Sequence, residues 1–242
     1  MNNKIWIIAK KDILEAFRSR STYFVLLIMI VLTFTYIASY SETVKNYDKE
    51  QAITYSRIFL NSLAYILPMM YSIFVCSVFA NYSVIVDKAK RNIESLMATP
   101  VSINQIWLGK SLAVTLPSLL VGITIAVLSF LVIEFWFVMP KTGTFIVPEI
   151  WAIVSTLLIV PAMLFSIVTI VTYIQLVVTN PRIGNFVFSG VFFVLLFGVN
   201  LLSGLGISFA LIFLAVIVVC GIVSYILSRY LTKEKVLLSS KI

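Results

Sequence analysis

The chain has 242 residues, of which 61% are hydrophobic and only 12% charged, and its formal net charge is +8. Soluble domains are near half apolar and a quarter charged, so this composition excludes an ordinary soluble domain and favours a membrane protein. The sequence contains no histidine, which removes the usual neutral-pH general base and the commonest metal ligand. Cys76 and Cys220 lie inside apolar runs, and we interpret both as small buried hydrophobic residues.

Residues 2–20 precede the first long apolar run and have the pattern of an amphipathic helix. At helical spacing one side carries Ile5, Ala9, Ile13, Ala16 and Phe17, and the other carries Lys4, Lys11, Glu15 and Arg18. A cation-rich helix of this kind is suited to lie in the headgroup plane of a bilayer. A soluble helix packed on a partner is the alternative. A signal peptide is a weaker interpretation, because the charged region is long and further spans follow it.

Six stretches are long and apolar enough to cross about 30 Å of hydrocarbon, which takes about 20 helical residues. They cover residues 22–40, 59–86, 112–138, 150–178, 183–202 and 207–227. Residues 203–206 (Ser-Gly-Leu-Gly) leave only a tight connection between the last two. The predicted fold is therefore a single all-α membrane domain of six transmembrane helices, preceded by the amphipathic helix.

The positive charges predict the orientation of these spans. Only Lys45, Lys49, Arg57 and Lys141 fall on one side of the predicted membrane, and the other fourteen of the eighteen Lys and Arg fall on the opposite side. The positive-inside rule places the fourteen, and both termini, in the cytoplasm. The membrane topology thus explains the excess of Lys and Arg, and no nucleic-acid partner is needed to account for it. The outer surface is limited to residues 41–58, 139–149 and the 203–206 turn, too little for a receptor domain.

Charged side chains are nearly absent from the spans, which argues against an ion-coupled transporter or an intramembrane enzyme. Glu134, near the outer end of the third span, is the exception; it could line an exit path, or reach the outer headgroups as a surface carboxylate. Thr169, Thr172 and Tyr173 share one helix face. Such a row could line a translocation path or a protomer interface, and interhelical hydrogen bonding is the commoner use.

The polar stretch 87–110 separates the second and third spans. We predict a short helix over residues 88–97, a break at Thr99-Pro100, and a second helix starting near Ile103, because Ser102 and Gln105 have capping-box spacing. Ile93, Leu96 and Met97 would share an apolar face that could grip a soluble partner. An interfacial connector without a partner is the alternative. Gly109-Lys110-Ser111 resembles the end of a phosphate-binding loop but lacks its first glycine and a preceding strand, so it is not a nucleotide site.

The segment RNIESLMATPVSINQIWLGKSLA (residues 91–113) resembles the cytoplasmic segment of type 2 ABC export permeases. The residues that match that family's pattern are Glu94, Leu96, Thr99, Pro100, Val101, Ser102, Gly109 and Lys110. The opening AKKDILEAFRSRSTYF is similar to the family's start, a membrane-surface "elbow" helix, with Ala9, Lys11, Asp12 and Arg18 at the matching positions. Asn92, Ile93 and Met97 depart from the pattern, and the short 203–206 turn leaves little room for the outer re-entrant helices of many members.

This resemblance implies the membrane subunit of an exporter in the plasma membrane of a prokaryote. Two copies, or one copy and a related permease, would pair with two separate ATP-binding cassette subunits. Arg91, Glu94, Leu96, Met97 and Thr99 would be the docking contacts. ATP and magnesium would bind in the partner, so that this chain holds no cofactor and no catalytic residue. The neutral, aromatic- and hydroxyl-bearing spans weakly favour an amphipathic substrate such as a peptide, a drug or a lipid-linked molecule.

A second class of protein needs the same polar stretch. A membrane scaffold or immunity protein that binds an ATPase partner without transporting anything would also carry a docking surface at residues 87–110. ATPase activity that a candidate substrate stimulates would separate the exporter from the scaffold.

Overall fold

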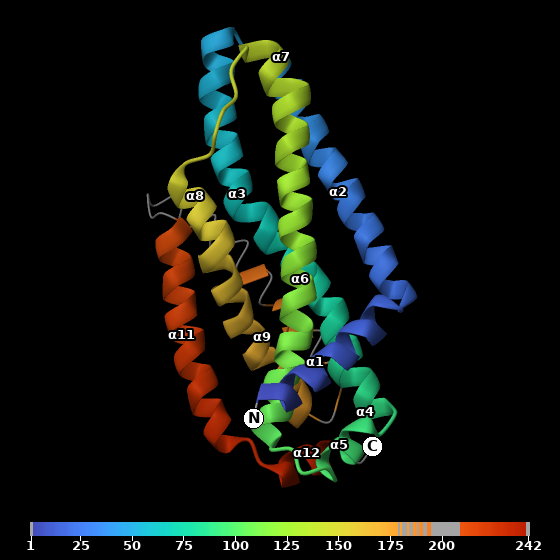
Figure 1. Ribbon diagram of the computed structural model, residues 1–242. Coiled ribbons are helices and arrows are strands. Elements are labelled where there is room, and N and C mark those ends of the chain that lie inside the picture. Colours follow the sequence, from blue (N-terminus) through green and yellow to red (C-terminus); the bar gives the residue numbers. More distant parts are fainter. Residues whose placement is uncertain are drawn as a thin grey trace.

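The computed structural model describes residues 2–178, 180, 183, 186–187, 189–190, 193–194 and 209–240. Across these residues the regular structure is entirely helical, with several long helices side by side and short helices gathered at one end (Figure 1). Five described helices are long and apolar enough to cross a membrane: Arg20–Lys45, Lys49–Ala89, Ile103–Thr142, Ile150–Val177 and Leu211–Tyr230. The predicted all-α class is confirmed for the described part of the chain, which has the character of a multi-pass membrane protein.

Several long helices are built from consecutive α and π segments. In chain order the elements are α1 (Asn2–Phe17), α2 (Arg20–Lys45), α3 (Lys49–Ala80), η1 (Asn81–Val86), α4 (Asp87–Ala89), α5 (Asn92–Met97), α6 (Ile103–Ile133), η2 (Glu134–Val138), α7 (Met139–Thr142), α8 (Ile150–Val154), η3 (Ser155–Ile159), α9 (Val160–Val177), α11 (Phe209–Tyr230) and α12 (Lys233–Ser240). The fourth predicted span is a continuous helix from α8 to α9, and the sixth corresponds to α11. The fifth, residues 183–202, and the 203–206 turn lie largely or wholly outside the described residues.

The predicted outer segment 41–58 is largely helical, and the segment 139–149 is helical at its start. Helix α2 runs on to Lys45 and α3 begins at Lys49, so only residues 46–48 turn the chain. Asp48 caps α3 through a capping box with Gln51, which satisfies backbone groups at the start of the helix. At the same end, the helix that includes α6 continues to Thr142 and stops at Gly143, whose φ of +73° suits glycine.

Helices α3 and α6 form the centre of the described bundle. Gly122 lets them approach closely, because a Cβ atom there would lie 3.0 Å from the Pro68 carbonyl oxygen and closer still to the Ser72 side chain. Around this pair the side chains form one large apolar cluster that includes Tyr40, Phe79 and Met163.

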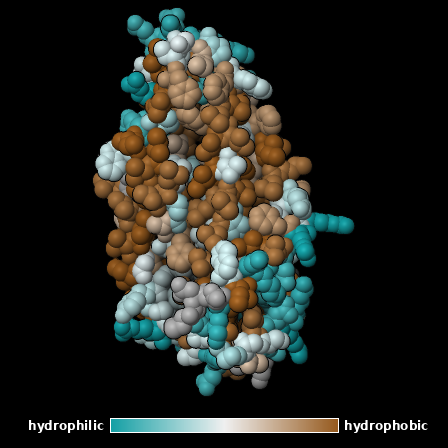
Figure 2. Space-filling model, in the orientation of Figure 1, coloured by the Kyte–Doolittle hydropathy of each residue, from teal (hydrophilic) through white to brown (hydrophobic). Residues whose placement is uncertain are grey.

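The outer surface of the bundle is apolar along the middle of the long helices. Figure 2 shows a broad hydrophobic belt between more hydrophilic ends. Helix α2 contributes strongly exposed side chains to it, including Phe24 (66%) and Phe34 (65%). Exposed apolar area on this scale is unfavourable in water and is expected where lipid or a partner covers it.

Candidate functional site

Helix α1 lies across the ends of the long helices, close to α4, α5 and α12 (Figure 1). We call this region the short-helix end. Helix α1 packs on α6 at Gly109, where a Cβ atom would lie 3.1 Å from the Ile5 carbonyl oxygen and 3.2 Å from the Ile8 Cβ. The missing side chain at Gly109 therefore allows the two backbones to cross closely. The buried face of α1 carries Ile8, Ala9 and Ala16, while Trp6 (53%) and Leu14 (51%) are exposed.

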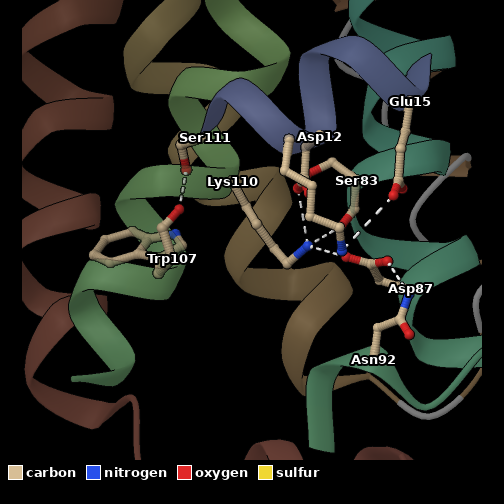
Figure 3. A network of polar contacts seen from close by, with 9 residues as sticks. Asp12, Glu15, Ser83, Asp87, Asn92, Trp107, Lys110 and Ser111 are labelled. Atoms are coloured by element: carbon tan, nitrogen blue, oxygen red, sulfur yellow. Dashed lines mark hydrogen bonds and ion pairs between the residues drawn. The ribbon is translucent and has the colours of Figure 1, made fainter. Parts of the chain in front are cut away.

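A buried ionic cluster lies where α1 crosses the bundle. Figure 3 shows Asp12, Ser83 and Asp87 around the ammonium group of Lys110, with Asn92 beside Asp87. The Lys110 Nζ atom donates to Asp12 Oδ2 at 3.0 Å and to Asp87 Oδ2 at 2.7 Å. Its third partner is the backbone carbonyl oxygen of Ser83. We call Asp12, Ser83, Asp87, Asn92 and Lys110 the Lys110 cluster.

The charged groups of the Lys110 cluster are buried, and hydrogen bonds compensate for their loss of contact with water. Lys110 is fully buried, and Asp12 and Asp87 are 3% and 1% exposed. An ammonium group has three hydrogens, and all three have acceptors here. The Ser83 hydroxyl donates to Asp12 Oδ2 at 2.6 Å, and the Asn92 amide donates to Asp87 Oδ1 at 2.8 Å. These neutral donors stabilise the extra negative charge of two carboxylates that share one cation.

The Lys110 cluster joins elements that are distant in sequence. Asp12 belongs to α1, Ser83 to η1, Asp87 to α4, Asn92 to α5 and Lys110 to α6. A displacement of α5 relative to α6 therefore has to break or remake buried charge-assisted hydrogen bonds. Such contacts are strong and directional, so the arrangement is suited to transmit a push on α5 to α1 and α6.

Two lysines donate hydrogen bonds to backbone carbonyl groups between the end of α5 and the start of α6. Lys233 of α12 donates to the Met97 carbonyl oxygen at 3.3 Å, and Lys4 of α1 donates to the Pro100 carbonyl oxygen at 3.1 Å. Met97 is the last residue of α5, so its carbonyl group has no partner inside that helix, and a cation there also offsets the negative end of the helix.

A third lysine, Lys88, is buried and ties α4 to the end of α9. Its Nζ donates to the Val178 carbonyl oxygen and to Ser239 Oγ, both at 2.9 Å. Ser239, on α12, donates in turn to the Leu176 carbonyl oxygen at 2.7 Å. The C-terminal helix thus closes over the ends of α4 and α9, and the short-helix end is one connected unit.

The predicted helix over residues 88–97 needs a correction, because the chain breaks inside it. Helix α4 ends at Ala89, Arg91 adopts the left-handed conformation with φ of 56°, and α5 begins at Asn92. The break turns Asn92 toward Asp87, so the ionic cluster and the break belong together. The predicted start of the second helix is confirmed: α6 begins at Ile103, and Ser102 and Gln105 make both hydrogen bonds of the capping box.

The apolar face predicted to grip a partner instead packs on this chain. Ile93 is fully buried and Met97 is 7% exposed, in a cluster with Ile8, Trp107 and Val236. Apolar side chains bury against the nearest complementary surface, and α1, α6 and α12 provide it.

The other predicted docking residues lie toward the outside of the same segment. Arg91 and Thr99 are exposed, while Glu94 and Leu96 are half-buried. The exposed residues of the segment 91–100 are Arg91, Ser95, Ala98, Thr99 and Pro100, so its outer side is partly polar, and the buried Met97 packs beneath it.

The hydroxyl row of the fourth span makes interhelical hydrogen bonds within the described chain. Thr172 bonds to Ser111 of α6 at 2.7 Å, and Thr169 bonds to Ser224 of α11 at 2.8 Å. Tyr173 packs edge-on against Trp107, with ring centroids 6.3 Å apart. Thr169 and Thr172 are buried, which matches the interhelical use named as the alternative to a path-lining role.

Glu134 does not reach outward as a surface carboxylate. Its side chain is fully buried at the start of η2, and Oε1 accepts a hydrogen bond from the Ile146 backbone N–H at 2.6 Å. The other oxygen, Oε2, has no hydrogen-bond partner within the described structure. Glu134 thus fastens the extended segment after Gly143 to the helix that precedes it.

Sequence reasoning missed the Lys110 cluster as a unit. Asp87 directly follows an apolar run, Lys110 directly precedes one, and Asp12 shares a helix face with Ala9 and Ala16. A charged residue next to an apolar run or on an apolar helix face is a signal that its side chain is buried and paired near the membrane edge. Their meeting depends on the crossing of α1 over α6, which no local pattern contains.

No protein-family model, curated protein or solved structure matches this chain. The function of the short-helix end is therefore inferred from its own residues and geometry.

Proposed function

We propose that this chain is the membrane permease subunit of an ATP-driven ABC exporter, and that residues 91–100 dock a separate ATP-binding subunit. The observation that carries the proposal is the attachment of α5. A short helix with a partly polar exposed side is linked through Asn92 to the buried Asp87–Lys110–Asp12 pairs. A solvated connector between two spans would not need such a buried ionic anchor.

The mechanism follows from which helices the Lys110 cluster joins. A partner that presses on Arg91 and Thr99 moves α5, and the cluster passes that movement to α1 and to the first turns of α6. Helix α6 continues to Thr142 at the opposite end, so a tilt at Lys110 is carried along its length. The spans then reorient around a path formed with a second copy of this chain or a related permease.

Membrane orientation in this proposal follows the distribution of Lys and Arg. Six spans with both termini in the cytoplasm of a prokaryote place the short-helix end, with its many cations, beside the ATP-binding subunits. ATP and magnesium bind and react in those subunits. The substrate is proposed to be amphipathic, because the described helices carry hydroxyl and aromatic side chains but few charges.

Co-purification from detergent tests the docking surface. The chain is used as bait alongside an Arg91→Glu variant, and Arg57→Glu is the matched control because Arg57 is exposed at the opposite end. We expect the wild type and Arg57→Glu to retain a candidate ATP-binding subunit, identified by its sequence and ATPase activity, and Arg91→Glu to lose most of it. Failure of the wild type to retain any ATP-binding subunit from cells that express one would remove the energy source of the proposal.

Reconstituted vesicles separate an exporter from a non-transporting scaffold. In an exporter, ATP drives movement of an amphipathic substrate across the vesicle membrane, and the substrate stimulates ATP hydrolysis. A stable complex whose ATPase activity responds to no substrate and moves none would favour the scaffold.

A further inference from the structure

A groove of about 400 Å³ lies between α6, α9 and α11, near the short-helix end. Its volume falls in the range of small-molecule sites, which is about 300–1,000 Å³. The lining is mixed: aromatic rings of Trp107, Phe165 and Tyr225 alternate with the hydroxyl groups of Ser166, Thr169, Ser224 and Ser228. Two of these hydroxyl groups lie on α9 and two on α11, in helices that are otherwise strongly apolar.

The hydroxyl hydrogens of Ser166 and Thr169 on α9, and of Ser224 on α11, already have acceptors. Ser166 donates to the Ala162 carbonyl oxygen at 2.9 Å, and Thr169 donates to the Ser166 carbonyl oxygen at 2.7 Å. Ser224 lies 2.8 Å from Thr169 Oγ1 and is therefore the donor in that pair. Each hydroxyl has one hydrogen and two lone pairs, so these three side chains offer the groove acceptors rather than donors.

Ser228 on α11 and Trp107 on α6 also have acceptors for their hydrogens. Ser228 donates to the Tyr225 carbonyl oxygen at 2.7 Å, and the Trp107 indole N–H donates to the Thr169 carbonyl oxygen at 2.8 Å. Arg229 stands beside the groove, with Nη2 on the Tyr225 hydroxyl oxygen at 2.5 Å. No carboxylate is among the lining residues. A cationic ligand would lack a counter-charge here and would face Arg229, while an anion would face the lone pairs of the four Ser and Thr hydroxyl oxygens. The exposed Asn104 amide at the α6 edge and the Tyr225 hydroxyl can donate, so a group that both donates and accepts a hydrogen bond fits this lining.

We propose that this groove binds a neutral amphiphile whose polar end is an alcohol. The alcohol hydrogen would bond to the free lone pairs of Ser224 and its neighbours, and the apolar body would lie against Phe165 and Tyr225. A ligand of this class reaches the groove by partitioning into the bilayer, which matches the apolar surface of α11 on either side of it. The inference concerns binding alone and does not depend on export.

Gly221 provides a way to fill the groove without disturbing the fold. It lines the groove, and a Cβ atom built on it meets no other atom within 4 Å. Gly190 is equally open but lies outside this groove, so Gly190→Leu is the matched control for Gly221→Leu. Both changes replace an exposed helical glycine by a better helix former.

Photolabelling in lipid nanodiscs tests the proposal. The probes are a long-chain alcohol that carries a diazirine and its methyl ether, which keeps the shape and loses the donor. We expect the alcohol to label peptides of α9 and α11 about fivefold more than the ether does, the ratio that one hydrogen bond provides. Gly221→Leu should remove most of this labelling and Gly190→Leu should not. Ser224→Ala should lower alcohol labelling toward that of the ether.

Several outcomes would overturn the proposal. One is equal labelling by alcohol and ether, and another is labelling that Gly221→Leu leaves unchanged. Circular dichroism and gel filtration of each variant establish that the fold is intact before labelling is compared.

Discussion

The Nζ atom of Lys110 lies 2.7 Å from Oδ2 of Asp87, and both side chains are buried. With Asp12 at 3.0 Å on the other side, Lys110 holds two carboxylates at the point where α1 crosses α6.

Replacement of Lys110 by methionine should strongly destabilise the protein. The change preserves most of the side-chain volume but leaves two buried carboxylates without their cation, which typically costs about 3–5 kcal/mol. Unfolding of the purified protein, followed by circular dichroism with added denaturant, measures the effect. Lys10→Met is the control, since Lys10 is exposed and its loss should change the free energy of unfolding by less than about 0.5 kcal/mol. Equal stability of the two variants would contradict the buried cluster.

Asp12→Asn and Asp87→Asn should each destabilise the protein less than Lys110→Met does. In either variant Lys110 keeps one carboxylate, and the asparagine side chain keeps an acceptor oxygen. A loss of about 1–3 kcal/mol is expected from one weakened charged hydrogen bond. The same unfolding assay measures this loss. If either variant loses as much stability as Lys110→Met, the two carboxylates do not both stabilise the Lys110 ammonium group.

Gly109→Val should displace α1 from α6. A Cβ atom at Gly109 already lies 3.1 Å from the Ile5 carbonyl oxygen, so a branched side chain requires the helices to separate, and overpacking of this kind costs about 1–3 kcal/mol. The exposed Gly221→Val serves as the control. Faster thiol labelling of a cysteine placed at Ala9, which is fully buried, would report the separation. Unchanged labelling would show that α1 does not depend on this close approach.

Thiol labelling should distinguish the two sides of the 91–100 segment. In a background with Cys76 and Cys220 replaced by alanine, Thr99→Cys should react with a membrane-impermeant maleimide and Met97→Cys should react at least about tenfold more slowly, because burial protects it. Lys49→Cys, at the opposite end, should be labelled from the other face of a sealed vesicle. Labelling of Thr99→Cys and Lys49→Cys from the same face would contradict the proposed topology.

Glu134→Gln should be tolerated much better than Glu134→Leu. Glutamine keeps an oxygen that can accept from the Ile146 N–H, whereas leucine leaves that buried donor without a partner, at a cost of about 1–3 kcal/mol. Limited proteolysis at residues 143–149 reports whether the segment is released. If Glu134→Gln abolishes transport while the segment stays protected, the carboxylate has a role in the path beyond this attachment.

The sequence by itself determined those helices and helix ends that depend only on residues close together in the chain. The long helix from Ile150 to Val177 follows from an uninterrupted apolar run, since backbone groups in hydrocarbon must bond within the helix. The start of α6 at Ile103 follows from Ser102 and Gln105, because a capping box needs only residues three apart. The predicted spans stop near Tyr40 and start near Phe59, where the apolar runs end, whereas α2 continues to Lys45 and α3 begins at Lys49, because a helix can extend past the hydrocarbon.

Tertiary structure alone decided which of these elements meet. Asp12 and Lys110 are 98 positions apart, and the sequence shows each of them only as a charge near the edge of an apolar stretch. Their contact requires α1 to turn across the bundle after Phe17 and to approach α6 at Gly109. The same holds for Met97, whose apolar face suits a partner or the chain itself equally well. In the structure Met97 packs against Trp107 and Val236 of the same chain. Its burial depends on which surface lies opposite it in the fold, and its sequence neighbours do not specify that surface.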